Sequence, residues 1–260
     1  MEYQNELEFA KQLARKAGDI MLKYFYEDID VEMKGDNTPL TIADTTINKL
    51  VIDEIKDHFP DHGIIGEEGN GGAPNAKLEW ICDPIDGTIP YSIKFPTSMF
   101  SLALYKNKQP VLGVLFDPYI SKLYHALEGG PAYCNDKVIS VKKGQFQKGD
   151  SIGVINVFGS GTFDTNYYNL TKVLNERMMR TEEIHCLVYF AVVVASGRMK
   201  CAFTPGAFAW DRAASLIIVR AAGGRVTDEN GAEATTFGNP KNLIFSNGDV
   251  HDEALALLHT

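Results

Sequence analysis

The chain has 260 residues, of which 45% are apolar and 23% are charged, as in an ordinary globular protein. This length fits one large domain or two closely packed halves. The formal net charge of −9 argues against a nucleic-acid surface, although a bound cation could still attract an anionic substrate. No apolar run reaches the about 20 residues of a membrane span, and the acidic N-terminus is not typical of a signal peptide.

The cysteines give no sign of a zinc or redox site, because none of them has C-x-x-C spacing. They are Cys82, Cys134, Cys186 and Cys201. We expect reduced, mostly buried thiols in a cytoplasmic protein.

Two amphipathic helices are predicted near the N-terminus. Over residues 5–26, apolar side chains recur at steps of three and four. A second helix is predicted over residues 41–59, with Thr41 as its N-cap and Asp44 three residues on. The segment 31–40 between them has turn chemistry and is expected to be irregular.

Short strands are expected next. The segment 63–66 should form a strand that delivers Glu67, and residues 69–76, rich in Gly, Asn and Pro, should form a mobile loop. Between residues 98 and 127, alternating apolar residues separated by turn signals predict an antiparallel meander.

Beyond residue 142 the order of elements is mixed. Strands are expected at 151–157, 200–203, 225–227 and 242–246, and helices at 166–176, 188–195, 212–222 and 250–258. Strands and helices in blocks favour an α+β fold of stacked layers. The polar stretch 142–150 is the expected boundary between an N-terminal half, residues 1–145, and a C-terminal half, residues 146–260.

The most informative motif is Asp-Pro-Ile-Asp-Gly-Thr at residues 83–88, which follows a short apolar run. A buried carboxylate without a partner costs several kcal/mol or becomes protonated. A Mg²⁺ ion held by Asp83, Asp86 and the carbonyl of Ile85 would satisfy both acids. The alternative is that the two acids cap a turn.

Gly87 and Thr88 should open a helical turn, with Pro90 within its first turn. Their free amides could bind phosphate oxygens, and the Thr88 hydroxyl could orient a water molecule. A simple N-cap role for Thr88 explains the sequence equally well.

Four more residues are candidates for the site, but each also has an ordinary structural explanation. Glu67 could be a solvated loop acid, and Asp211 could cap the helix at 212–222, hold a metal, or do both. Lys34 and Asp44 are, on residue type alone, ordinary surface residues.

Three separated motifs together resemble the inositol monophosphatase family. They are Gly-Glu-Glu at 66–68, the motif at 83–88, and Trp-Asp-Arg-Ala-Ala at 210–214 with a Gly pair at 223–224. This is a family of lithium-sensitive, Mg²⁺-dependent phosphatases that also holds fructose bisphosphatases and 3′-phosphoadenosine phosphatases. The resemblance covers nearly the whole chain and implies a five-layer α-β-α-β-α sandwich, usually dimeric.

The resemblance also implies a site with two or three Mg²⁺ ions, of which Asp83 would bridge the first two. The implied metal ligands are Glu67, Asp83, Ile85, Asp86 and Asp211. The implied substrate contacts are Asp86, Gly87, Thr88, Asp211 and Lys34. The implied catalytic residues are Glu67 and Thr88, which would position the attacking water, and Asp44, which would support Thr88.

The expected activity is therefore hydrolysis of a small phosphate monoester by metal-activated water. The half at 1–145 would carry most metal ligands, and the half at 146–260 would carry Asp211 and the substrate loop, in one catalytic unit. The expected partners are a phosphorylated metabolite and a second copy of the chain, without nucleic acid polymer or membrane.

The chain departs from the family pattern around the substrate. Ile-Pro-Tyr stands at 89–91, Thr204 stands where the family has an inositol-contacting Glu, and His185 and Cys186, interpreted as non-metal residues, begin the segment that replaces Gly-Thr-Ala. These departures weaken inositol 1-phosphate as the substrate. Histidinol phosphate, 3′-phosphoadenosine 5′-phosphate and fructose 1,6-bisphosphate remain open, as does a catalytically silent, metal-binding regulatory role.

Overall fold

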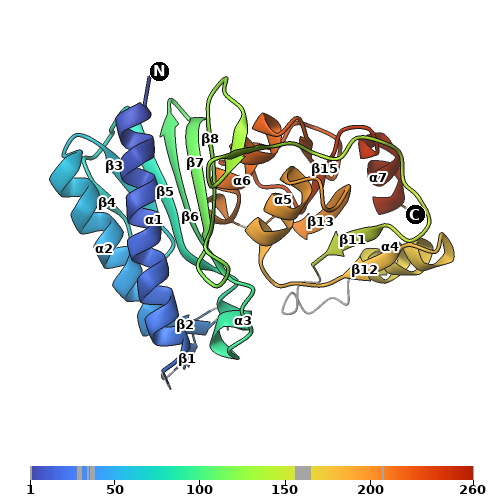
Figure 1. Ribbon diagram of the computed structural model, residues 1–260, viewed down its shortest axis with the longest axis horizontal. Coiled ribbons are helices and arrows are strands. Elements are labelled where there is room, and N and C mark those ends of the chain that lie inside the picture. Colours follow the sequence, from blue (N-terminus) through green and yellow to red (C-terminus); the bar gives the residue numbers. More distant parts are fainter. Residues whose placement is uncertain are drawn as a thin grey trace.

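The computed structural model describes residues 2–27, 31–33, 35, 39–155, 165–206 and 208–259. Lys34, one of the implied substrate contacts, lies outside these residues. The described elements stack as helices, sheet, helices, sheet and helices (Figure 1). The predicted five-layer α+β sandwich is therefore confirmed.

The first layer consists of α1 (Gln4–Phe25) and α2 (Ile42–His58), which cover one face of the larger sheet. Both helices match their predicted ranges to within two residues. Thr41 caps α2 as predicted: its hydroxyl accepts the amide of Ala43 at 3.2 Å, and its own amide donates to Asp44 at 2.8 Å. This reciprocal capping box satisfies amides that the first helical turn leaves free.

The second layer is an eight-stranded sheet with the order β10-β9-β8-β7-β6-β5-β3-β4. Its strands are β3 (Gly63–Gly66), β4 (Gly71–Gly72), β5 (Leu78–Asp86), β6 (Met99–Lys106), β7 (Gln109–Asp117), β8 (Lys122–Leu127), β9 (Ala132–Cys134) and β10 (Lys137–Ile139). The predicted meander is β6 to β8 and is antiparallel throughout. The sequence did not predict β9 and β10, which extend it by a short hairpin.

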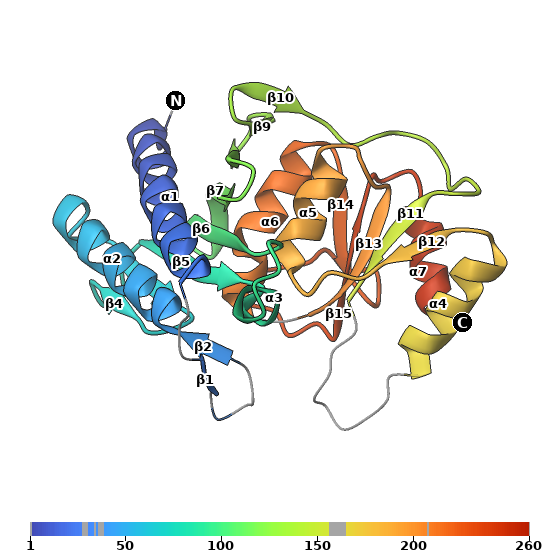
Figure 2. The same ribbon diagram turned by 60° about the horizontal axis from the view of Figure 1, so that its bottom comes forward.

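The third layer lies between the two sheets and consists of α5 (Leu187–Ala195) and α6 (Ala209–Ala221) (Figure 2). Because α6 is covered on both sides, eight consecutive residues from Arg212 to Val219 are buried. This burial explains why the helix is built from small and apolar residues. The predicted start at residue 212 was three residues too late.

The fourth layer is a five-stranded mixed sheet with the order β12-β11-β13-β15-β14. Its strands are β11 (Ser151–Val154), β12 (Arg180–Glu182), β13 (Cys201–Pro205), β14 (Arg225–Asp228) and β15 (Asn242–Ser246). The fifth layer, α4 (Thr165–Glu176) and α7 (His251–Leu258), covers its outer face. Of these five strands, β12 is the one that the sequence did not predict. The predicted division at residue 145 stays a prediction.

Two predicted irregular segments contain short strands. In the segment 31–40, β1 (Val31–Met33) pairs antiparallel with β2 (Pro39–Thr41), so the prediction of irregular chain was wrong there. The segment 69–76 includes β4, which pairs with β3. The short helix α3 (Thr88–Ser92) follows β5 and begins after Gly87, as the turn chemistry predicted.

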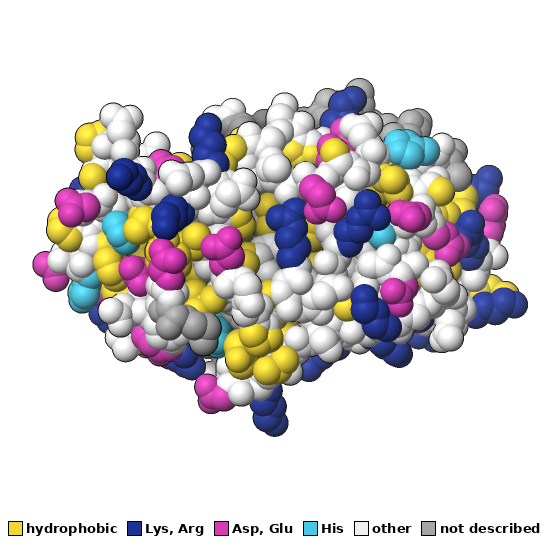
Figure 3. Space-filling model, turned by 90° about the horizontal axis from the view of Figure 1, so that it is seen from above, with side chains coloured by type: hydrophobic (Ala, Val, Ile, Leu, Met, Phe, Trp, Pro, Cys, Tyr) yellow, Lys and Arg dark blue, Asp and Glu magenta, His cyan; other side chains and the backbone are white. Residues whose placement is uncertain are grey.

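Several composition-based expectations can be compared with the structure. Cys82, Cys186 and Cys201 are buried and Cys134 is half-buried, all as free thiols. Within the described residues, no helix combines the length and apolar character needed to cross a bilayer. On the face shown in Figure 3, Lys and Arg side chains lie among Asp and Glu side chains rather than in one basic field.

Candidate metal centre

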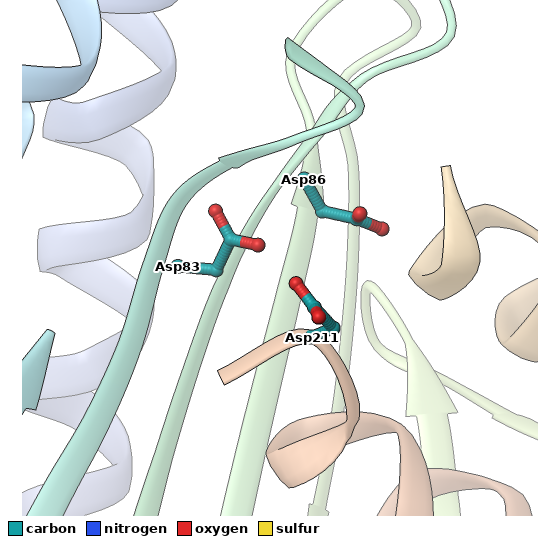
Figure 4. Close-up of side chains that lie close together, drawn as sticks. All are labelled: Asp83, Asp86 and Asp211. Atoms are coloured by element: carbon teal, nitrogen blue, oxygen red, sulfur yellow. The ribbon is translucent and has the colours of Figure 1, made fainter. Parts of the chain in front are cut away.

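Three carboxylates converge where β5 ends and α6 begins. Asp83, Asp86 and Asp211 each offer an oxygen, and these oxygens lie within 4.8 Å of one another (Figure 4). Asp83 and Asp86 are buried, and Asp211 is partly buried. The structure thus brings together three acids that the sequence had singled out from two distant motifs.

A β-bulge explains how Asp83 and Asp86 reach the same site. Both acids lie at the C-terminal end of β5, which closes at Asp86, as expected for a strand that ends in acids. Residues three apart on a regular strand point to opposite faces of the sheet. Here Asp83 pairs with Ser101 but Asp86 pairs with Met99, so β5 carries one extra residue between the acids. That extra residue returns Asp86 to the side of Asp83.

Burial and nearby negative charges raise the pKa of all three acids. Burial, followed by the nearby charges of Glu67, Asp86 and Asp211, raises the pKa of Asp83 well above its usual range. Burial also raises the pKa of Asp211 to about 7 and that of Asp86 to about 6. Like charges this close disfavour ionisation unless a cation compensates them. An oxygen-only donor set of this kind suits Mg²⁺.

Glu67 lies beside Asp83 because of the strand register. Strand β3 runs parallel to β5 with Gly66 opposite Cys82, and the amide of Glu67 donates to the Cys82 carbonyl at 3.1 Å. The next residue on β5 is Asp83. Both the charge of Glu67 and a side-chain hydrogen bond with it help to raise the pKa of Asp83. Glu67 is thus part of the acidic cluster and not an isolated loop acid.

The second oxygen of Asp86 is held by the N-terminus of α5. Asp86 Oδ2 accepts the amide of Val188 at 2.7 Å and the thiol of Cys186 at 3.2 Å. A carboxylate at a helix N-terminus is also favoured by the helix dipole. Sequence reasoning treated Cys186 as unrelated to the acids, since a lone thiol before an apolar helix carries no signal of such a contact.

Asp211 lies in the first turn of α6 and is not its N-cap, which corrects one of the alternatives from the sequence. The N-cap is Phe208, whose amide donates to Asp211 Oδ2 at 2.6 Å. This bond fixes one carboxylate oxygen. The other can face the acids of β5, as Figure 4 shows.

Gly87 and Thr88 lie directly after the acids. Gly87 has φ +87°, and a Cβ placed there would come within 3.0 Å of the Cys186 Cβ. Only glycine fits this conformation without strain. The hydroxyl of Thr88 donates to the carbonyl of Ile85 at 3.0 Å. Each of these two oxygens keeps a lone pair for a further partner.

Asp44 is fully buried at the start of α2. Its Oδ2 accepts the amide and hydroxyl of Thr41, whereas its Oδ1 is buried without a hydrogen-bond partner. Burial raises the pKa of Asp44 to about 7, and the charges of Glu67 and Glu68 add to the shift. Among the described residues, the Thr88 hydrogen goes to Ile85 rather than to Asp44.

Comparisons with known proteins agree with this geometry. A family model described as the inositol monophosphatase family matches residues 2–260. A fructose-1,6-bisphosphatase/inositol-1-monophosphatase of Thermotoga maritima is 35% identical, with 98% of this chain and 96% of the relative covered. Inositol monophosphatase 1 of Homo sapiens is 30% identical, covering 98% and 94%. The solved structure of a Thermotoga maritima IMPase superposes with TM-score 0.89 at 32% identity, covering 98% and 97%.

Proposed function

This chain belongs to the inositol monophosphatase family, and from that premise we propose that it hydrolyses a small phosphate monoester in a Mg²⁺-dependent reaction. The observation that carries the proposal is the cluster of Asp83, Asp86 and Asp211, whose oxygens lie within 4.8 Å of one another. Bound Mg²⁺ would supply neutralisation of the phosphate dianion and a lowered pKa for water.

We propose the metal ligands that the family membership implies, three of which the structure brings together. Asp83, Asp86, Asp211, Glu67 and the carbonyl of Ile85 would hold two or three ions. The raised pKa values of Asp83 and Asp211 support this proposal, because ionised carboxylates at this spacing need a compensating charge.

The neighbouring residues would position the substrate and the water. Gly87 and Thr88 provide amides beside the acids, and these amides would contact phosphate oxygens. Because the Thr88 hydroxyl already donates to Ile85, it would act as an acceptor that orients the attacking water together with Glu67. The Oδ1 of Asp44, which is buried without a hydrogen-bond partner, would serve as a second acceptor for this water. Lys34 is proposed as a substrate contact from its sequence position alone.

The names of the relatives suggest several candidates for the alcohol part of the ester. The names of the Thermotoga maritima and human relatives make inositol 1-phosphate and fructose 1,6-bisphosphate the first compounds to test. Histidinol phosphate and 3′-phosphoadenosine 5′-phosphate complete the set. We further propose lithium inhibition, a homodimer and a cytoplasmic location.

Phosphate release from these four compounds, with Mg²⁺ and with EDTA, tests the proposal. Release that needs Mg²⁺ and is lost in Asp83→Asn supports it. If no phosphate monoester, these four compounds included, releases phosphate although calorimetry detects Mg²⁺ binding, the silent metal-binding role takes the place of hydrolysis.

A further inference from the structure

An exposed aromatic ring lies next to the metal centre. Phe208 is 60% exposed, whereas phenylalanine is among the residues most often buried in proteins. Its own amide donates to the carboxylate of Asp211 at 2.6 Å, so its backbone adjoins a residue of the acidic cluster. The residue that carries the ring thus adjoins the metal centre, which would hold the phosphate of a bound ester.

The ring of Phe208 packs with one face against a second aromatic ring. It stacks on the ring of Trp210 with a centroid distance of 5.0 Å and an angle of 17° between the planes. Trp210 in turn packs against the core between the two sheets. A flat ring supported in this way offers its outer surface without the entropy cost of ordering a mobile side chain.

The neighbouring positions add apolar surface rather than polar groups. Ile89, directly after Thr88, is 48% exposed. On the strand leading to Phe208, Thr204 is only 2% exposed, and its hydroxyl donates to the carbonyl of Pro205 at 3.3 Å. Thr204 therefore offers no hydroxyl to a polyol at this side of the centre.

We propose that Phe208 is a specificity-determining residue that stacks on the substrate, so that the centre prefers phosphate monoesters whose alcohol carries an aromatic ring. This inference rests on the proposed phosphatase function and narrows its substrate class. Stacked aromatic pairs gain enough free energy to change affinity by about threefold to tenfold.

Three esters of primary alcohols test the preference, because their leaving groups have similar basicity. They are 2-phenylethyl phosphate, 2-cyclohexylethyl phosphate, which is a saturated control of similar size, and glycerol 1-phosphate. The full chain with Mg²⁺ should show a KM for the phenylethyl ester about threefold to tenfold below that for the glycerol ester. The cyclohexyl ester should fall between them.

Variants at Phe208 test whether this side chain causes the preference for the phenylethyl ester. Phe208→Ala keeps the backbone amide that binds Asp211, and the ratio of kcat/KM between the phenylethyl and glycerol esters should fall to about one. Phe208→Trp should retain the ratio. Tyr168→Ala is the matched control, since Tyr168 is also 60% exposed but lies on the outer helix α4, and it should leave the ratio unchanged.

The outcomes separate this inference from the function on which it rests. Mg²⁺-dependent hydrolysis of all three esters without a ring preference, or a preference that survives in Phe208→Ala, overturns the inference and leaves the phosphatase in place. Failure to hydrolyse any phosphate monoester, including the four metabolites above, overturns both.

Discussion

The thiol of Cys186 lies 3.2 Å from the carboxylate of Asp86, although 100 residues separate them in the chain. The amide of Val188 donates to the same oxygen at 2.7 Å. These two donors hold Oδ2, and the backbone of Gly87 also hydrogen-bonds to this carboxyl group. Cys186 thus acts on the centre through Asp86 without being a ligand itself.

We predict that Cys186→Ala weakens Mg²⁺ binding by about tenfold, because residues that orient a metal ligand typically contribute at least this much affinity. Cys186→Ser should restore binding, since its hydroxyl replaces the donor. Titration calorimetry measures the affinity, and Cys134→Ala, at a half-buried thiol, is the control. Equal affinity in Cys186→Ala and the unchanged chain would show that the backbone donors of Val188 and Gly87 suffice.

Asp83→Asn should lower phosphate release by more than about 100-fold while the protein stays folded, because the variant loses a charged ligand of the centre. Without Mg²⁺ its melting temperature at pH 8 should equal or exceed that of the unchanged chain, since one of several repelling charges is gone. Circular dichroism follows the melting. The exposed Asp57→Asn serves as a control, and near-normal turnover in folded Asp83→Asn would contradict the assignment.

The raised pKa values of Asp44, Asp86 and Asp211, at about 7, 6 and 7, predict how the stability of the metal-free protein depends on pH. An unfolded Asp has a pKa of about 3.9, so the folded state binds more protons than the unfolded state between about pH 4 and 7. The contribution of these groups to stability is therefore complete below about pH 4 and is lost as the pH rises through 7.

Mg²⁺ should reverse this loss, since it binds the ionised carboxylates. We expect the rise in melting temperature on adding Mg²⁺ to be larger at pH 8 than at pH 5, as measured by calorimetry against EDTA. A Mg²⁺ effect of equal size at both values of pH would argue against binding at these acids.

Gly87→Ala should reduce phosphate release and cost about 1–2 kcal/mol of stability, because alanine is strained at φ +87°. Its Cβ would also come within 3.0 Å of the Cys186 side chain and disturb the contact with Asp86. Gly129→Ala separates these effects: Gly129 has φ +72° with nothing within 4 Å of its Cβ position. Urea unfolding should detect strain in both variants, but only Gly87→Ala should lose activity.

The sequence predicted the layered fold and the acids of the centre because both have local signals. Apolar periodicity marks α1, α2 and the β6–β8 meander, and the motif at 83–88 concentrates two acids and a glycine turn. The bulge in β5 was not predictable, because its cause is the pairing with β6 and not the residues of β5 alone.

Other features depend on contacts between distant segments. Residues 180–182 join a sheet only because β11 lies beside them, so three residues of moderate β propensity gave no signal. The start of α6 was placed too late because Asp211 suits an N-cap by residue type, whereas the chain uses the backbone of Phe208. The contact between Cys186 and Asp86 likewise depends on how α5 packs against the larger sheet.

The position of α6 between the two sheets has a consequence for internal motion. Asp211 belongs to α6, whereas Asp83 and Asp86 belong to the larger sheet. An ion coordinated by all three would cross-link these two bodies, so relative sliding of the layers should slow when the centre is filled. Amide hydrogen exchange in β5 and in the first turn of α6 would then report ion occupancy, even when no substrate is being turned over.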